Sequence, residues 1–197
     1  MISAEVVGFI AGGIGMFFGL PQALRVRRLG HGSGVSLMSW LFQFGSVTCW
    51  ASYGLDINSP SVLLTNIGAG LVNASVIMAI MKNNLKSIAL LSVYAFAVSA
   101  FILNLPSAVV SVLLIAVVFS QSPQVYKSYR NLHAGALSAV SISALSVSSA
   151  SILLWFLYAV LADVALIFLS SSIAVLINIS IIILELMGKR WRALKAA

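Results

Sequence analysis

A few uncharged polar and aromatic side chains lie inside long apolar segments of this chain. Trp50 and Asn66 occur in the first half, and Trp155 and Ser171 occur 105 residues later. Such groups can hydrogen bond or stack against a polar solute that leaves water. They also carry no charge, and a buried charge is costly and would hold the solute too tightly. These residue types therefore predict a binding site for a small neutral polar solute.

Two further amides extend the pattern along the same segments. Asn66, Gly70 and Asn73 are spaced i, i+4 and i+7, so they share one face of a helix. The matching residues in the second half are Ser171, Val175 and Asn178. Each kind of candidate has an ordinary structural alternative. Tryptophans gather at membrane surfaces, and asparagines can join helices by hydrogen bonds worth only about 0.6 kcal/mol on average.

No catalytic constellation accompanies these residues. An intramembrane enzyme needs paired acids, a Ser-His set or a metal cluster at membrane depth, and the sequence offers none of them. Cys49 is the single cysteine, so the chain has neither an intrachain disulfide nor a zinc spacing. His31 and His133 fall in equivalent polar loops, where solvated side chains explain them better than a metal site does. We therefore expect a protein that is not an enzyme and that uses no metal and no cofactor.

The matching positions arise because the chain is a tandem duplication. Two motifs recur after 105 residues, Trp50-x-x-Tyr53 as Trp155-x-x-Tyr158 and Asn73-x-Ser75 as Asn178-x-Ser180. The pair Pro21-Gln22 recurs as Pro123-Gln124 after 102 residues, so the loop that follows is three residues longer in the second half. A repeat at so long a spacing indicates a duplicated domain rather than a solenoid.

The composition places these repeats in a membrane. The chain is 61% hydrophobic and only 8% charged, whereas soluble domains are about 45–50% apolar. A helix needs about 20 apolar residues to cross the bilayer. Seven segments qualify as transmembrane helices of an all-α membrane protein: 4–25, 35–55, 60–81, 86–104, 106–127, 138–161 and 164–188.

The charges predict how these segments are oriented. All eleven Lys and Arg residues follow the first, third, fifth or seventh segment, and none lies in the alternate loops. Because basic loops stay in the cytoplasm, the N-terminus is expected outside and the C-terminus inside, in a plasma membrane or bacterial inner membrane. The net charge of +7 therefore marks contact with the lipid bilayer, not with nucleic acid. The sequence leaves a homo-oligomer open.

Parity of the segments predicts the domain organisation. A three-helix unit duplicated in tandem would reverse its orientation, and one inserted helix restores it, so the repeats become parallel. The expected arrangement is three plus one plus three. The first repeat covers 1–82, a linker transmembrane helix covers 83–104, and the second repeat with its basic tail covers 105–197.

The two prolines predict weak points in the first helix of each repeat. Proline removes a backbone donor and kinks or breaks a helix, here at Pro21 and Pro123 near the cytoplasmic third. Gln22 and Gln124 can bond the carbonyls that are freed. A hinge that opens the inner side is one interpretation, and a fixed kink is the other.

Several of these motifs together resemble the PQ-loop repeat of the SWEET and SemiSWEET sugar transporters. The first half carries Leu20-Pro21-Gln22, Val35-Ser36, Trp50-x-x-Tyr53-Gly54 and Thr65-Asn66, and the second half carries Ser122-Pro123-Gln124, Val140-Ser141 and Trp155-x-x-Tyr158. The resemblance implies two three-helix bundles joined by a linker helix, which pass mono- or disaccharides by alternating access.

The resemblance also implies roles for single residues. Trp50 and Trp155 would stack on the two faces of a sugar, Asn66 would hydrogen bond it, and Tyr53 and Tyr158 would form an outer gate. The second half departs from the family pattern, because Ser171 stands where Asn66 stands in the first half.

The mode of transport and its alternatives follow from the charges. Glu185 is the only carboxylate well within a span, and Lys189 follows at i+4, so an ion pair that reaches the inner surface explains it. We therefore expect a uniporter rather than a proton symporter. The alternatives are a PQ-loop transporter of amino acids or vitamins, and a membrane cargo receptor that does not transport.

Overall fold

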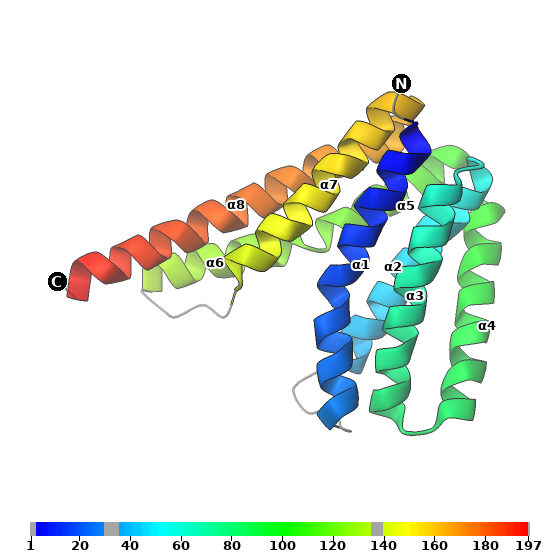
Figure 1. Ribbon diagram of the computed structural model, residues 1–197, viewed down its shortest axis with the longest axis horizontal. Coiled ribbons are helices and arrows are strands. Elements are labelled where there is room, and N and C mark those ends of the chain that lie inside the picture. Colours follow the sequence, from blue (N-terminus) through cyan, green and yellow to red (C-terminus); the bar gives the residue numbers. More distant parts are fainter. Residues whose placement is uncertain (1–2, 30–35, 135–139, 197) are drawn as a thin grey trace.

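In the computed structural model the chain folds into helices throughout the part that the structure describes, residues 3–29, 36–134 and 140–196 (Figure 1). The helices in order are α1 (Ala4–Leu29), α2 (Leu37–Asp56), α3 (Pro60–Met81), α4 (Asn84–Leu103), α5 (Ser107–Phe119), α6 (Ser122–Ala134), α7 (Ile142–Ala162) and α8 (Ala165–Ala196). No strand occurs in these ranges. The expected all-α fold class is confirmed.

Five described stretches are long and apolar enough to cross a membrane. They are Pro60–Met81, Asn84–Leu103, Ser107–His133, Ile142–Ala162 and Ala165–Trp191. They support an integral membrane protein. The described apolar part of α1, Ala4–Met16, is shorter, and α2 is not among the five. The count of seven spans stays a prediction.

Side-chain caps fix where several helices begin. Ser36, Ser59 and Ser141 each accept a hydrogen bond from the backbone N–H three residues on, which satisfies a donor that the first helical turn leaves free. Asn83 does the same for α4. The serine of the repeated Val-Ser motif is therefore the N-cap of the second helix in each half.

The third helix of each half packs against both the first and the second. α3 contacts α1 and α2, and α8 contacts α5, α6 and α7, while α4 lies against α2 and α3. α1 also packs on α7, which joins the two halves. Small residues allow this approach, because a Cβ on Gly8 or Gly12 would collide with Ser61 or Thr65 of α3.

The two halves meet at one end of the molecule and diverge toward the other (Figure 1). The N-terminus, the turn between α2 and α3 and the turn between α7 and α8 gather where they meet. We call this the closed end, and its residues include Glu5, Ser59 and Tyr158. The opposite end, which we call the basic end, carries the α3–α4 turn with Lys82 and the ends of α6 and α8.

The fifth predicted span is divided, contrary to the expectation of one helix over 106–127. α5 ends at Phe119 and α6 begins at Ser122, with Pro123 in its first turn. The turn between them is closed by short i to i+3 bonds, from Ser120 N to Val117 O (3.1 Å) and from Gln121 N to Val118 O (3.3 Å). Proline has no N–H to continue the ladder, so the helix stops and restarts at the second Pro-Gln pair.

The first Pro-Gln pair behaves differently. α1 runs unbroken from Ala4 to Leu29 and contains Pro21 and Gln22, whose side chains lie outside the described part. α1 packs on both α3 and α7, whereas α5 and α6 pack mainly on α8. The expected break therefore occurs as an interruption of the helix in the second half only.

Candidate solute-binding cavity

A cavity of about 190 Å³ lies between the two halves of the chain. It is lined by Trp50, Val62, Asn66, Val118, Ile152, Trp155, Ile167, Ser170, Ser171 and Ala174, which come from α2, α3, α5, α7 and α8. The structure thus brings together four of the six residues that the sequence nominated: Trp50, Asn66, Trp155 and Ser171. Their role in binding a solute stays a prediction.

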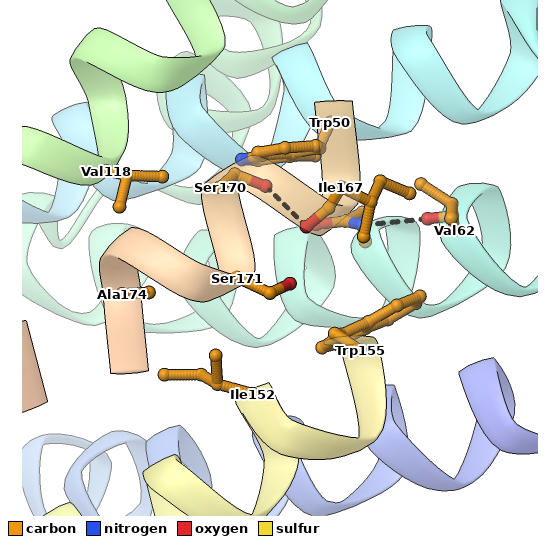
Figure 2. Close-up of a pocket in the computed structure, with 10 residues that line it drawn as sticks. Trp50, Val62, Val118, Ile152, Trp155, Ile167, Ser170, Ser171 and Ala174 are labelled. Atoms are coloured by element: carbon orange, nitrogen blue, oxygen red, sulfur yellow. Dashed lines mark hydrogen bonds between the residues drawn. The ribbon is translucent and has the colours of Figure 1, made fainter. Parts of the chain in front are cut away.

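The two indole rings face the cavity from different halves. Figure 2 shows Trp50 and Trp155 on opposite sides, with Ser171 and Ile167 between them. Each ring is steadied by the tyrosine of its own motif. The rings of Trp50 and Tyr53 meet edge to face at 6.0 Å, and those of Trp155 and Tyr158 at 5.4 Å. The Trp-x-x-Tyr motif therefore builds two matching aromatic walls.

Asn66 keeps most of its hydrogen-bonding capacity. Its Nδ2 donates to Val62 O at 2.8 Å, within the same helix. An amide offers two N–H donors and an acceptor oxygen, so one donor and the oxygen are left for a solute. Ser171 is 5% exposed and adds a hydroxyl from the other half. Ser170, also on the lining, donates to Ile167 O at 3.1 Å.

Asn73 and Asn178 do not line this cavity, although both are buried. Asn178 Nδ2 lies 3.2 Å from Ser148 Oγ and 3.4 Å from Ser149 Oγ, and it donates to these hydroxyls of α7. These bonds join α8 to α7, which is the structural alternative that asparagines offer in membrane helices. Contact of Asn73 or Asn178 with a solute in the small cavity is therefore not supported by this geometry.

A larger cavity of about 1380 Å³ adjoins the small one. Both are lined by Trp50 and Val118, and the larger one extends to Met38 in the first turn of α2 and to Gln121 beyond α5. We call it the vestibule. It runs toward the basic end and also includes Asn178.

Sequence reasoning missed the polar lining of the vestibule. Ser39, Gln43 and Ser46 lie at i, i+4 and i+7 on α2, so they form one polar face that a helical count would have found. Gln121 and Ser148 face the same space from the second half. Polar side chains thus line the vestibule from both halves of the chain.

The closed end is sealed on the other side of the small cavity. Val62 and Ile167 line the cavity and also belong to an apolar cluster with Val7, Tyr158 and Ala159. Tyr158 is 1% exposed, and its hydroxyl donates to Ser59 Oγ at 2.7 Å. Tyr158 and Tyr53 thus lie where an outer gate was expected, although gating itself stays a prediction.

Glu5 is a residue of the closed end that sequence reasoning did not single out. Its Oε2 accepts Ser61 N at 2.7 Å, and its Oε1 accepts Ser59 Oγ at 3.0 Å and lies 3.3 Å from Tyr158 OH. A lone carboxylate in the first turn of an apolar helix was the available signal.

A second polar cluster lies near the basic end. Gln124 Nε2 donates to Ser128 Oγ (3.3 Å), and Ser128 Oγ donates to Glu185 Oε1 (2.7 Å). Gln124 thus reaches a side chain rather than a freed carbonyl. Glu185 is 4% exposed, so the expectation that it extends to the inner surface is wrong. The packing of α6 on α8 covers it.

His133 is exposed, and its ring lies 4.2 Å from that of Tyr129, while His31 is outside the described residues. No group of three or more metal-binding side chains occurs within the described ranges.

Comparison with protein-family models gives no match, and a search of curated proteins finds no similar one. The class of protein must therefore be argued from the fold and the cavity. These describe a helical membrane protein with a small uncharged cavity between two similar halves, next to a vestibule on one side and to an apolar cluster on the other.

Proposed function

We propose that this protein is a membrane carrier for a small neutral polar solute, most simply a sugar, and that it works by alternating access as a uniporter. One observation carries the proposal. The cavity between Trp50 and Trp155 shares Trp50 and Val118 with a vestibule toward the basic end, while Tyr158 and its neighbours pack together at the closed end. A site that is accessible from one side at a time is what a carrier requires.

The lining favours a solute with both apolar and hydroxyl surfaces. Indole faces pack against C–H groups, and Asn66 and Ser171 offer donors and acceptors to hydroxyls. None of the lining residues is charged. The volume lies below the range of about 300–1,000 Å³ that holds drug-sized ligands, which favours a monosaccharide over a disaccharide.

Arrangement and charge support the same proposal. α3 and α8 occupy corresponding places in the two halves and α4 packs against α2 and α3, which supports the three plus one plus three arrangement of the SWEET family as a proposal. With Lys82 and its basic neighbours in the cytoplasm, the vestibule opens inward. The structure then corresponds to an inward-open state in a plasma membrane or bacterial inner membrane.

A second candidate is a proton-coupled carrier of amino acids or vitamins. The burial of Glu185, with its 2.7 Å bond from Ser128, favours it over the cargo receptor. A receptor for an acidic peptide would want cations in its cavity, and none lines it. A uniporter should only equilibrate the solute across the membrane, with or without a pH gradient. Accumulation driven by an imposed gradient would favour the second candidate.

Counterflow in proteoliposomes tests the proposal. Vesicles loaded with an unlabelled solute are mixed with a trace of the same radiolabelled solute, using hexoses, disaccharides, neutral amino acids and vitamins in turn. Transient accumulation of a hexose is expected with the wild-type protein and not with empty liposomes. If no sugar shows counterflow but an amino acid does, the solute class would be amino acids rather than sugars. Failure of all solutes would contradict the carrier.

A further inference from the structure

One carboxylate of the closed end differs from the others there. Asp56 and Asp163 are exposed at the ends of α2 and α7. Glu5 is half-buried in the first turn of α1, and both of its oxygens are engaged. A carboxylate fixed in this way restrains whatever it bonds.

The bonds of Glu5 connect three helices. Oε2 accepts the backbone N–H of Ser61 (2.7 Å), in the first turn of α3, and Oε1 accepts the hydroxyl of Ser59 (3.0 Å), the N-cap of that helix. The first turn of a helix has free N–H groups and a partial positive charge, which suits a carboxylate. Glu5 therefore ties the start of α1 to the start of α3.

Tyr158 brings the other half into this network. Its hydroxyl donates to Ser59 Oγ (2.7 Å), with Glu5 Oε1 3.3 Å away, and its ring is buried against Val7 and Val62. Hydrogen bonds that involve an ionised group are roughly twice as strong as neutral ones. Because Tyr158 belongs to α7, the second half cannot move from the first at this end without leaving these partners.

The backbone is shaped to permit the contact. A Cβ on Gly8, one turn after Glu5, would lie 2.7 Å from Ser61 Cβ and 3.0 Å from the ring of Tyr158. Real side chains do not tolerate the first distance, so a larger residue would push α1 away from α3. The small residue lets the Glu5 carboxylate reach its partners.

We propose that Glu5 is a latch for the closed end, a positioning residue whose carboxylate holds Tyr158 against α1 and α3. Opening of the closed end must then break the bonds around Ser59. The role in transport rests on the proposed function, whereas the latching itself does not depend on any particular solute.

Accessibility of the sealed cluster tests the latch. Ile167 is 4% exposed and lies between the seal and the cavity, so Ile167→Cys, with Cys49→Ala, reports opening. A membrane-impermeant thiosulfonate is added from the side that the closed end faces, which labelling of exposed Leu161→Cys identifies. We expect Glu5→Gln to speed labelling of Ile167→Cys by about tenfold, as loss of one charge-assisted bond implies.

Two further variants provide a control and an independent test. Asp56→Asn removes an exposed carboxylate at the same end and should leave the labelling rate unchanged. Tyr158→Phe removes only a hydroxyl and should speed labelling, and combined with Glu5→Gln it should add less than its separate effect, because both act on one network. Tyr158→Phe also decides the matter if Glu5→Gln lowers the yield of folded protein.

Each outcome has one meaning. Unchanged labelling in both Glu5→Gln and Tyr158→Phe, in protein that melts like the parent, would overturn the latch even if counterflow succeeds. Faster labelling in a protein that carries none of the tested solutes would support the latch and refute the carrier.

Discussion

The two halves of this molecule close the same end with different chemistry. Tyr158 of the second half meets hydroxyls and a carboxylate on the first, with Ser59 at 2.7 Å. Tyr53 of the first half packs instead among the apolar side chains of a cluster that includes Ile102, Val110 and Leu166. The positions 105 residues after Ser59 and Ser61 hold Val164 and Leu166, which cannot hydrogen bond through their side chains. Duplication kept the tyrosines, and their partners diverged.

The basic end shows the opposite kind of difference. Gln124, Ser128 and Glu185 form a buried polar chain in the second half, where α5 and α6 are separate helices. The equivalent residues of the first half are Gln22, Val26 and Ile80, and α1 continues past Gln22 and Val26. We infer that bending at the basic end is concentrated in the second half.

The largest expected effect concerns the cavity tryptophan that each half contributes. Trp50→Ala or Trp155→Ala should abolish counterflow, because each removes one aromatic wall, while folding should persist since both rings are only half-buried. Trp191→Ala, which changes an exposed tryptophan in the tail, serves as the control. Normal transport by both cavity variants, measured at equal abundance, would exclude the site.

The next largest effect on transport should come from the amide and the hydroxyl that the two halves place in the cavity. Asn66→Ala should weaken solute binding by about 1–3 kcal/mol, because a solute hydroxyl is left unpaired in a dry cavity. Ser171→Ala should cost less, since water replaces one hydroxyl more easily than an amide. Half-saturation in counterflow measures both. Greater damage from Ser171→Ala would reverse the proposed order.

Stability of the polar chain at the basic end gives a smaller effect. Ser128→Ala removes a buried hydroxyl that donates to Glu185 Oε1, and loss of this one hydrogen bond should lower stability by about 0.5–1.5 kcal/mol. A lower melting temperature is expected in detergent. Ser111→Ala, at an exposed serine that bonds its own helix, is the matched control and should melt like the parent. Equal melting of the two variants would contradict the account of this cluster.

The smallest effect should separate the two prolines. Pro123→Ala permits α5 and α6 to fuse and should slow transport several-fold without changing half-saturation. Pro21→Ala, inside a helix that is already continuous, should change the rate less. Single-turnover efflux compares them. A larger loss for Pro21→Ala would place the bend in the first half instead.

Sequence reasoning located the cavity better than its closure. Trp50, Asn66, Trp155 and Ser171 were found because their spacing repeats and their types are rare at membrane depth. Asn178 was assigned to the same site because it shares a helical face, but its bonds to Ser148 and Ser149 depend on how α7 and α8 pack. Glu5 meets Ser61 and Tyr158 across large sequence distances. No local pattern encodes such a contact.

Some helix boundaries can likewise be predicted from the sequence, and others cannot. Ser36, Ser59 and Asn83 begin helices by local capping, which a sequence reveals. The stop at Phe119 and the continuation through Pro21 were not distinguishable, because both segments carry the same Pro-Gln pair. The two pairs differ in their tertiary neighbours, since α1 packs on α3 and α7 whereas α5 and α6 pack mainly on α8.

Distances between spin labels at the two ends test alternating access most directly. One pair, Leu55→Cys with Leu161→Cys, spans the halves at the closed end. The other, Leu85→Cys with Met187→Cys, reaches at the basic end from α4, which packs on the first half, to α8 of the second half. All four residues are exposed. With Cys49→Ala as background, the account predicts a short distance at the closed end and a long one at the basic end without solute. Addition of the solute identified by counterflow should create a second population, with a long distance at the closed end and a short one at the basic end. Two distances that stay fixed while the protein transports solute, or that lengthen together, would contradict alternating access.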